Sequence, residues 1–362
     1  MKRFAYFSIL VLTLAVIAPR LHAGDHQPLP HGVSLVASTI PANGDVNPYG
    51  LSVEPVTSGN LTAGHLLVSN FNNGQNLQGT GTTIMDIAPN GTVIQFAQID
   101  PANLPGPCPG GVGLTTALNV LRNGWVIVGS LPTTDGMSDT AQAGCLLVLN
   151  NVGSVVETFS GSLINGPWDS ALADSGNTSA LFVSNVLNGT VAGGGNIVNQ
   201  GTVIRIDLVS STTQMPEIES ITVIGSGFAE RTDPAALVIG PTGVGLGSGT
   251  LYVADSLENR IGAIANALTR TDSAGRGTLL TAGAFLNDPL GLTVAPNGVI
   301  LTVNGNNGLG IAITPAGQQV RRVVLDNTGM PPGAGALFGL ADVTGTGLYF
   351  VDDASNTLNL FQ

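Results

Sequence analysis

The stretch Asp288-Pro289-Leu290-Gly291-Leu292-Thr293-Val294 decides how this sequence is interpreted, because related openings recur five more times along the 362 residues. Each opening is a small-residue or Gly-Leu step that leads into an apolar segment. Internal similarity at such intervals is typical of proteins built from repeated structural units. The positions taken as equivalent are Gly50, Gly113, Asp169, Ala236, Gly291 and Gly339.

Three further apolar segments follow a complete opening. The second segment ends in a polar residue, as at residues 251–255, and the third and fourth follow after short turns, as at 81–88 and 92–99. Asn-Gly pairs mark several turns, and this pair accepts the positive φ angles that tight hairpins require. The unit is therefore predicted to be a four-stranded antiparallel meander. Six such units predict an all-β fold, a six-bladed β-propeller.

The two ends of the chain test this prediction. After Gly339 the sequence has room for only three strands, so the last blade lacks its outer strand. Residues 31–40 precede the first opening and form an apolar segment with no other partner. We expect this N-terminal strand to join the last blade and close the ring, which removes exposed sheet edges. Residues 24–362 are then a single propeller domain.

The N-terminus predicts export. Residues 1–23 combine Lys2 and Arg3, an apolar run and a small residue at Ala23, which is the pattern of a secretory signal peptide. The apolar run is too short for a transmembrane anchor, so no membrane span is expected in the mature chain. The predicted location is the periplasm or the exterior, and a monomer is expected.

Charge excludes several partners. The formal net charge is −12 at pH 7, and Lys2 is the only lysine, so removal of the signal peptide leaves none. A field of this sign repels phosphate backbones and anionic lipid surfaces, so nucleic acid is not an expected partner. Schiff-base chemistry and phosphate loops, which use lysine, are excluded from the mature chain as well.

The repeats resemble those of a known group, the NHL-repeat-like six-bladed propellers of bacterial exported proteins. The resemblance rests on Asn47-Pro48-Tyr49-Gly50-Leu51, on Asp288-Pro289-Leu290-Gly291-Leu292 and on the second strand Leu251-Tyr252-Val253-Ala254-Asp255-Ser256. The blade at Pro167 departs most, because Trp168-Asp169 stands where Gly-Leu is usual. The resemblance implies a scaffold that commonly binds proteins or ligands, and it implies no particular reaction.

Loop length predicts which face carries function. In a propeller the connections between blades and those between second and third strands emerge on one face, named here the first face. The longest loops, including 131–143 and 187–200, fall on that face. Long loops on a rigid scaffold concentrate binding residues. Trp168, Asp169 and Tyr49 are the ligand-binding candidates there, although packing between blades is the favoured explanation for the two aromatic residues.

Two further features lie on the first face. Cys108 and Cys145 fall in neighbouring loops, and an even cysteine count in an exported chain predicts a disulfide. The carboxylates suggest calcium, which takes six to eight oxygen ligands. Turn capping is the favoured explanation for such aspartates, and a calcium site is the alternative. The metal candidates are Asp169, Asp233, Asp255, Asp288 and Asp352, with Asp353 beside the last.

Two functional hypotheses follow. No His-x-x-x-His pair and no Gly-x-Ser-x-Gly elbow occurs, so zinc hydrolysis and an α/β-hydrolase serine are not indicated. The first hypothesis is a binding or scaffold propeller that recognises a protein, peptide or glycan through its loop-rich face, without catalysis. The second is a calcium-dependent hydrolase or lyase similar to lactonase-like propellers, with a carboxylate ring lining the channel. Glu54 is misplaced for that ring, so binding is favoured.

Overall fold

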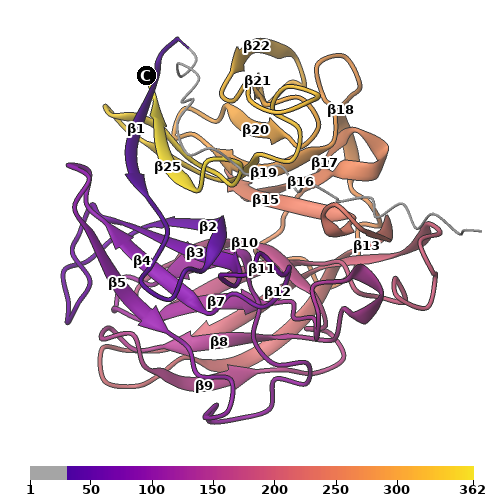
Figure 1. Ribbon diagram of the computed structural model, residues 1–362. Coiled ribbons are helices and arrows are strands. Elements are labelled where there is room, and N and C mark those ends of the chain that lie inside the picture. Colours follow the sequence, from indigo (N-terminus) through magenta and orange to yellow (C-terminus); the bar gives the residue numbers. More distant parts are fainter. Residues whose placement is uncertain (1–30) are drawn as a thin grey trace, which may run out of the picture.

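The computed structural model describes residues 31–362 and shows six antiparallel sheets arranged as the blades of a propeller (Figure 1). The predicted all-β, six-bladed fold is confirmed. Strands account for nearly all the regular structure, and two short 3₁₀ helices, η1 (Ser138–Thr140) and η2 (Ser256–Glu258), are the only helices in this range. None of the described helices is long and apolar enough to cross a membrane. The predicted signal peptide, residues 1–23, lies outside the described residues.

The first three blades follow one another along the chain. The first blade contains β2 (Val46–Val53), β3 (Leu66–Asn72), β4 (Thr83–Ile87) and β5 (Val93–Gln98). The second contains β6 (Leu114–Val120), β7 (Val126–Ser130), β8 (Cys145–Leu149) and β9 (Val155–Phe159). The third contains β10 (Pro167–Asp174), β11 (Thr178–Asn185), β12 (Val198–Val209), β13 (Glu217–Asp233) and an additional short strand, β14 (Leu237–Ile239).

The last three blades have four strands each. The fourth blade contains β15 (Pro241–Gly247), β16 (Thr250–Asp255), β17 (Arg260–Ile264) and β18 (Thr278–Ala282). The fifth contains β19 (Pro289–Val294), β20 (Ile300–Asn304), β21 (Leu309–Ile313) and β22 (Gln319–Val324). The sixth contains β23 (Leu337–Val343), β24 (Gly347–Asp352), β25 (Thr357–Phe361) and the N-terminal strand β1 (Val33–Ser38).

The ring closes as predicted. Strand β1 pairs antiparallel with β25, from Val33 opposite Phe361 to Ser38 opposite Thr357. Figure 1 shows these two segments from opposite ends of the chain lying side by side. The last blade therefore takes its outer strand from the N-terminus, and closure leaves no blade with a missing strand.

The predicted register of the repeat is wrong in two blades. Gly113 precedes β6, and Leu114 is the residue that pairs with the end of the second strand, at Ser130. Ala236 lies between β13 and β14 of the third blade, so the fourth blade begins later, at Pro241, which pairs with Asp255. Asp233 therefore ends a long fourth strand and does not open a blade. The β13–β14 hairpin, which lies outside the repeat, caused the error in the fourth blade.

A β-bulge marks the start of every innermost strand. The register shifts after Pro48, Leu114, Pro167, Pro241, Pro289 and Leu337, each of which pairs with the polar end of its second strand. A bulge adds an unpaired residue and bends the strand. Glycine follows in four blades because the next blade is too close for a side chain. A Cβ on Gly291 would overlap the carbonyl oxygen of Phe338, and one on Gly339 would overlap that of Tyr49.

The predicted disulfide is present. Cys108 and Cys145 are bonded, with their Cα atoms 5.1 Å apart and 37 residues between them in sequence. Cys145 begins β8 and is fully buried, while Cys108 lies in the loop that joins the first two blades. The bond joins two first-face segments of the second blade. The described residues include no free cysteine.

Candidate ligand site in the central channel

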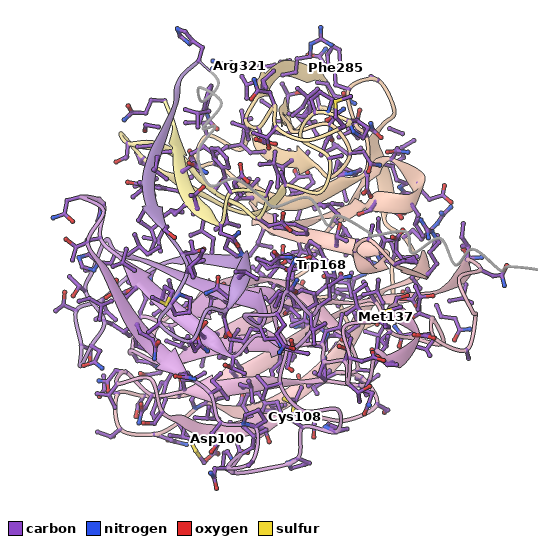
Figure 2. All side chains as sticks on the ribbon, in the orientation of Figure 1. Asp100, Cys108, Met137, Trp168, Phe285 and Arg321 are labelled. Atoms are coloured by element: carbon purple, nitrogen blue, oxygen red, sulfur yellow. A yellow bond between two sulfur atoms is a disulfide. The ribbon has the colours of Figure 1, made fainter. Side chains whose placement is uncertain are left out.

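Apolar side chains fill the first-face end of the central channel. The residue that follows each strand-opening position is Tyr49, Thr115, Trp168, Thr242, Leu290 or Phe338. Tyr49 stacks on Phe338 with ring centroids 3.8 Å apart and on Phe71 with centroids 4.5 Å apart. Trp168 lies 6.2 Å from Phe338 and near the centre of the molecule (Figure 2). We name Tyr49, Phe71, Trp168, Leu290 and Phe338 the plug; all five side chains are buried.

The β13–β14 hairpin covers the plug. Leu237 and Val238 of β14 belong to the same buried cluster as Tyr49 and Trp168. The side-chain nitrogen of Gln78 donates a 3.1 Å hydrogen bond to the carbonyl oxygen of Pro234 at the hairpin tip. Because Gln78 belongs to the first blade and Pro234 to the third, the hairpin reaches across the first-face end of the channel. Only a void of about 10 Å³ remains among these side chains.

The other end of the channel is hollow. A cavity of about 260 Å³ is lined by all six innermost strands, β2, β6, β10, β15, β19 and β23. Its lining residues belong mainly to the second halves of these strands, so it opens on the second face, opposite to the long loops. Polar side chains contribute to its wall, including Ser52, Asn119, Ser170 and Thr293. We name this space the central cavity.

The wall is also rich in backbone polar groups. Each innermost strand is paired on one side only within its sheet, so its other edge faces the channel. Such an edge carries N–H and C=O groups that no sheet partner satisfies. Asn119 donates a 2.5 Å hydrogen bond to the hydroxyl of Ser170, which ties the second blade to the third at the wall. The central cavity is therefore suited to a small polar molecule.

Asp169 occupies the inner end of the central cavity. It stands at the position that glycine takes in four other blades, and its side chain accepts a 2.9 Å hydrogen bond from the backbone N–H of Val244 in the next blade. Its own N–H donates to the hydroxyl of Ser184. Burial raises the pKa of Asp169 to about 8, although the hydrogen bond from Val244 acts in the opposite direction. At neutral pH the carboxyl group is therefore largely protonated and can donate a hydrogen bond.

The other predicted metal ligands do not join Asp169. Asp233 forms an ion pair with Arg231, with oxygen and nitrogen 2.6 Å apart. Burial and, to a smaller extent, the nearby charge of Asp233 raise the pKa of Asp288 to about 6, against the opposing effect of Arg231. Asp255 is fully buried with neither carboxyl oxygen hydrogen-bonded, and burial raises its pKa to about 6 against the opposing effect of Arg260.

A second acidic group lies in the sixth blade. Asp352 accepts a 3.0 Å hydrogen bond from the backbone N–H of Ser355. Burial raises the pKa of Asp352 to about 6 and that of Asp353 to about 8, and the charge of Asp326 raises both. Within residues 31–362, no three His, Cys, Asp or Glu side chains are placed to hold one metal ion. The five predicted ligands therefore do not form one cluster of carboxylates, and calcium binding by any of them stays a prediction.

The predicted ligand-binding residues separate into two environments. Asp169 lines the central cavity, whereas Tyr49 and Trp168 are in the plug, where each is 4% exposed. Ligand binding by the two aromatic residues stays a prediction. Sequence reasoning missed the polar wall residues Asn119, Ser170 and Thr293, because they occupy ordinary strand positions. The available signal was the run of apolar residues directly after the blade openings, which predicts a filled channel end.

The fold and the channel define the class of protein, a six-bladed β-propeller with its central cavity on the face opposite to the long loops. No protein-family model matches the sequence, and no curated protein is similar enough to count as a relative. The finer assignment to NHL-repeat-like propellers stays a prediction.

Solved structures of other propellers are similar to this chain. One is regucalcin of Agrobacterium tumefaciens, a calcium-binding protein, with a TM-score of 0.55, 13% identity and coverage of 90% of this chain and 93% of that one. A gluconolactonase of Xanthomonas campestris has a TM-score of 0.53 and 12% identity, with coverage of 88% of this chain and 86% of that one. Virginiamycin B lyase of Staphylococcus aureus has a TM-score of 0.51 and 15% identity, with coverage of 90% of this chain and 84% of that one. At these identities the similarity shows the fold alone.

Proposed function

We propose that this propeller binds a small, neutral, polar molecule of sugar or sugar-lactone size in the central cavity. The observation that carries the proposal is Asp169, a buried carboxyl group at the inner end of a cavity. The wall of this cavity contains hydroxyl, amide and backbone groups, a second carboxyl group at Asp342, and several leucine and valine side chains. A protonated carboxyl group donates one hydrogen bond and accepts others, which suits a hydroxyl-rich ligand. The loop-rich face remains the proposed site for any protein, peptide or glycan partner.

Titration calorimetry with glucose, galactose and glucono-1,5-lactone tests this proposal. The expected result is saturable binding of at least one of them with one site per chain. Thr293→Trp, which fills the cavity and removes no side-chain hydrogen bond, should abolish binding. Thr212→Trp, in an exposed loop on the same face, is the matched control and should bind as the unchanged protein does. Equal binding by the Thr293 variant would overturn the assignment of the cavity.

Catalysis in the same cavity is a second candidate, which the gluconolactonase-like neighbours and the raised pKa of Asp169 favour. A carboxyl group that titrates near neutral pH is suited to general acid–base catalysis. In lactone hydrolysis the ionised carboxylate would accept a proton from the attacking water. It would then return that proton to the ring oxygen as the C–O bond breaks.

Hydrolysis of glucono-1,5-lactone, followed with a pH indicator, separates binding from catalysis. If the second candidate is right, Asp169→Asn lowers kcat by about 10²–10⁴-fold, the usual contribution of a general acid–base group. Assays with added calcium and with a chelator test the predicted calcium dependence. If the protein binds the lactone saturably but hydrolyses it no faster than the uncatalysed reaction, the binding function is supported and the catalytic function is contradicted.

A further inference from the structure

The wall between the fifth and sixth blades has a gap beside the central cavity. A space of about 250 Å³ is lined by β20, β21 and β22 of the fifth blade and by β23, β24 and β25 of the sixth. Its wall is mainly apolar, in contrast to the central cavity. We name it the side groove; its apolar residues are Leu301, Ile311, Ala312, Val323, Leu348 and Phe361.

The gap affects only part of this blade interface. Val303, Leu325 and Leu337 pack tightly and are at most 1% exposed, so the first-face half of the interface is filled. Leu301, Val323 and Phe361 pack against the same cluster but are only partly buried. Ala312 has too small a side chain to fill the space that it lines. The groove therefore leaves apolar surface in contact with water that a longer apolar group could cover.

Within the described part of the chain, Asp342 is the one residue that the linings of the side groove and the central cavity share. This residue lines both spaces, and it also lines a shallow depression at the second-face rim. It belongs to β23, the innermost strand of the sixth blade, whereas Arg321 belongs to β22, the outermost strand of the fifth. Arg321 lies 5.4 Å from the centre of the Phe361 ring and at the outer edge of the molecule (Figure 2). The groove thus extends from the channel toward the rim.

We infer that the central cavity and the side groove together bind an amphipathic molecule, with a neutral polar head in the cavity and an unbranched alkyl or acyl chain in the groove. The inference rests on the proposed function of the central cavity. Charge excludes an anionic head, because Asp342 borders the space of the head and the whole chain is acidic. The protonated carboxyl group of Asp169 is suited to hydrogen-bond a neutral hydroxyl-bearing head. The chain covers the apolar groove wall and displaces water from it.

Octyl β-D-glucopyranoside and methyl β-D-glucopyranoside, which differ only in chain length, provide the test. Both are titrated into the whole protein below the concentration at which the octyl compound forms micelles. The octyl compound is expected to bind at least tenfold more tightly than the methyl compound, with one site per chain. Octanoate, which has a similar chain and an anionic head, should bind at least tenfold more weakly than the octyl glucoside.

Filling the groove should remove only the contribution of the chain. Ala312→Phe is expected to reduce the advantage of the octyl compound to less than twofold while binding of the methyl compound stays the same. Ala312→Leu, a smaller change that is easier to accommodate in the fold, should give an intermediate loss. Ala316→Phe, in the exposed turn between β21 and β22, is the matched control and should change neither affinity.

The outcomes separate this inference from the proposed function. Binding of the methyl compound with no gain from the octyl chain overturns the groove and leaves the cavity. Octyl binding that Ala312→Phe weakens, without any methyl binding, supports the groove and contradicts a sugar-sized ligand held by the cavity alone. Octanoate binding as tight as that of octyl glucoside overturns the neutral head. Binding of neither glucoside overturns this inference, whereas the proposed function then still depends on the separate titrations with glucose, galactose and glucono-1,5-lactone.

Discussion

The two ends of the central channel are built from the same six strands but serve opposite purposes. At the first-face end, Tyr49, Trp168 and Phe338 follow the strand openings and meet in an apolar plug. A few residues later the same strands line a polar cavity that opens on the second face. The difference arises at the bulge, where glycine in most blades brings the backbones together and Asp169 takes its place in the third. One end of the channel therefore stabilises the ring, and the other is free to bind.

The largest expected effect comes from the plug. Phe338→Ala should lower the free energy of unfolding by about 3–5 kcal/mol, the usual cost of removing a buried phenylalanine ring. Thr293→Ala, at the open end of the same channel, should change it by less than about 0.5 kcal/mol. Urea denaturation of the two variants measures the contrast. Equal losses at the two ends would contradict the division of the channel into a stabilising and a binding end.

The disulfide should have the next largest effect. It holds the loop that leads into β8, and Ala141 of that loop packs in the cluster that contains the plug. The double variant Cys108→Ala/Cys145→Ala should lower the free energy of unfolding by about 2–4 kcal/mol, because the unfolded chain loses a constraint. Denaturation of the oxidised and reduced protein checks the value. Free thiols at both positions in non-reducing peptide maps would contradict the bond itself.

Much of this fold could be predicted from the sequence, because the spacing of the repeat indicates the number and order of the strands in each blade. The Pro-x-Gly openings at Pro48 and Pro289 and the polar strand ends gave the blade, and the N-terminal strand gave the closure of the ring. The β13–β14 hairpin was missed because it lies outside the repeat. It also displaced the predicted opening of the fourth blade from Pro241 to Asp233.

The site was harder to predict than the fold. Asp169 was chosen as a candidate because it stands where Gly-Leu is usual, and the structure places it at the inner end of the central cavity. Its expected carboxylate partners are distributed among different blades, and sequence spacing does not report distances across a ring. Loop length pointed to the first face, whereas side-chain volume decided which end of the channel is hollow. Trp168 fills space at one end, and glycine leaves space beside the other.

Stability should depend on pH in a way that Asp169 helps to set. Burial raises its pKa to about 8 in the folded chain, against about 3.9 in an unfolded one. The folded state therefore binds the proton of Asp169 more tightly than the unfolded state does. The contribution of this proton to the free energy of unfolding is complete below about pH 4 and is lost as the pH rises to about 8. The loss is at most about 1.4 kcal/mol per pH unit for this group. Glu54, Glu230 and Asp353, with pKa values also raised to about 8, act in the same direction.

Asp169→Asn tests how much of the pH dependence of stability comes from this residue, because an amide keeps the shape of the side chain and does not ionise. The melting temperature of the unchanged protein should fall between pH 5 and pH 8, and that of the variant should fall less. The variant should be the more stable protein at pH 8. Asp139→Asn, at an exposed position in η1, provides the control and should follow the unchanged protein. Parallel curves for all three proteins would show that Asp169 does not titrate in this range.

The smallest effect concerns the cover of the plug. Gln78→Ala removes the hydrogen bond to Pro234 at the tip of the β13–β14 hairpin, which should cost about 0.5–1 kcal/mol. Because this bond joins the first blade to the third across the channel, its loss should increase hydrogen exchange at β14 and leave the outer strands unchanged. Gln75→Ala, which removes an exposed side chain without a hydrogen bond, is the control. Binding in the central cavity should not change, since the plug lies between the hairpin and the ligand site. A change in binding without faster exchange at β14 would show that the plug does not isolate the two ends.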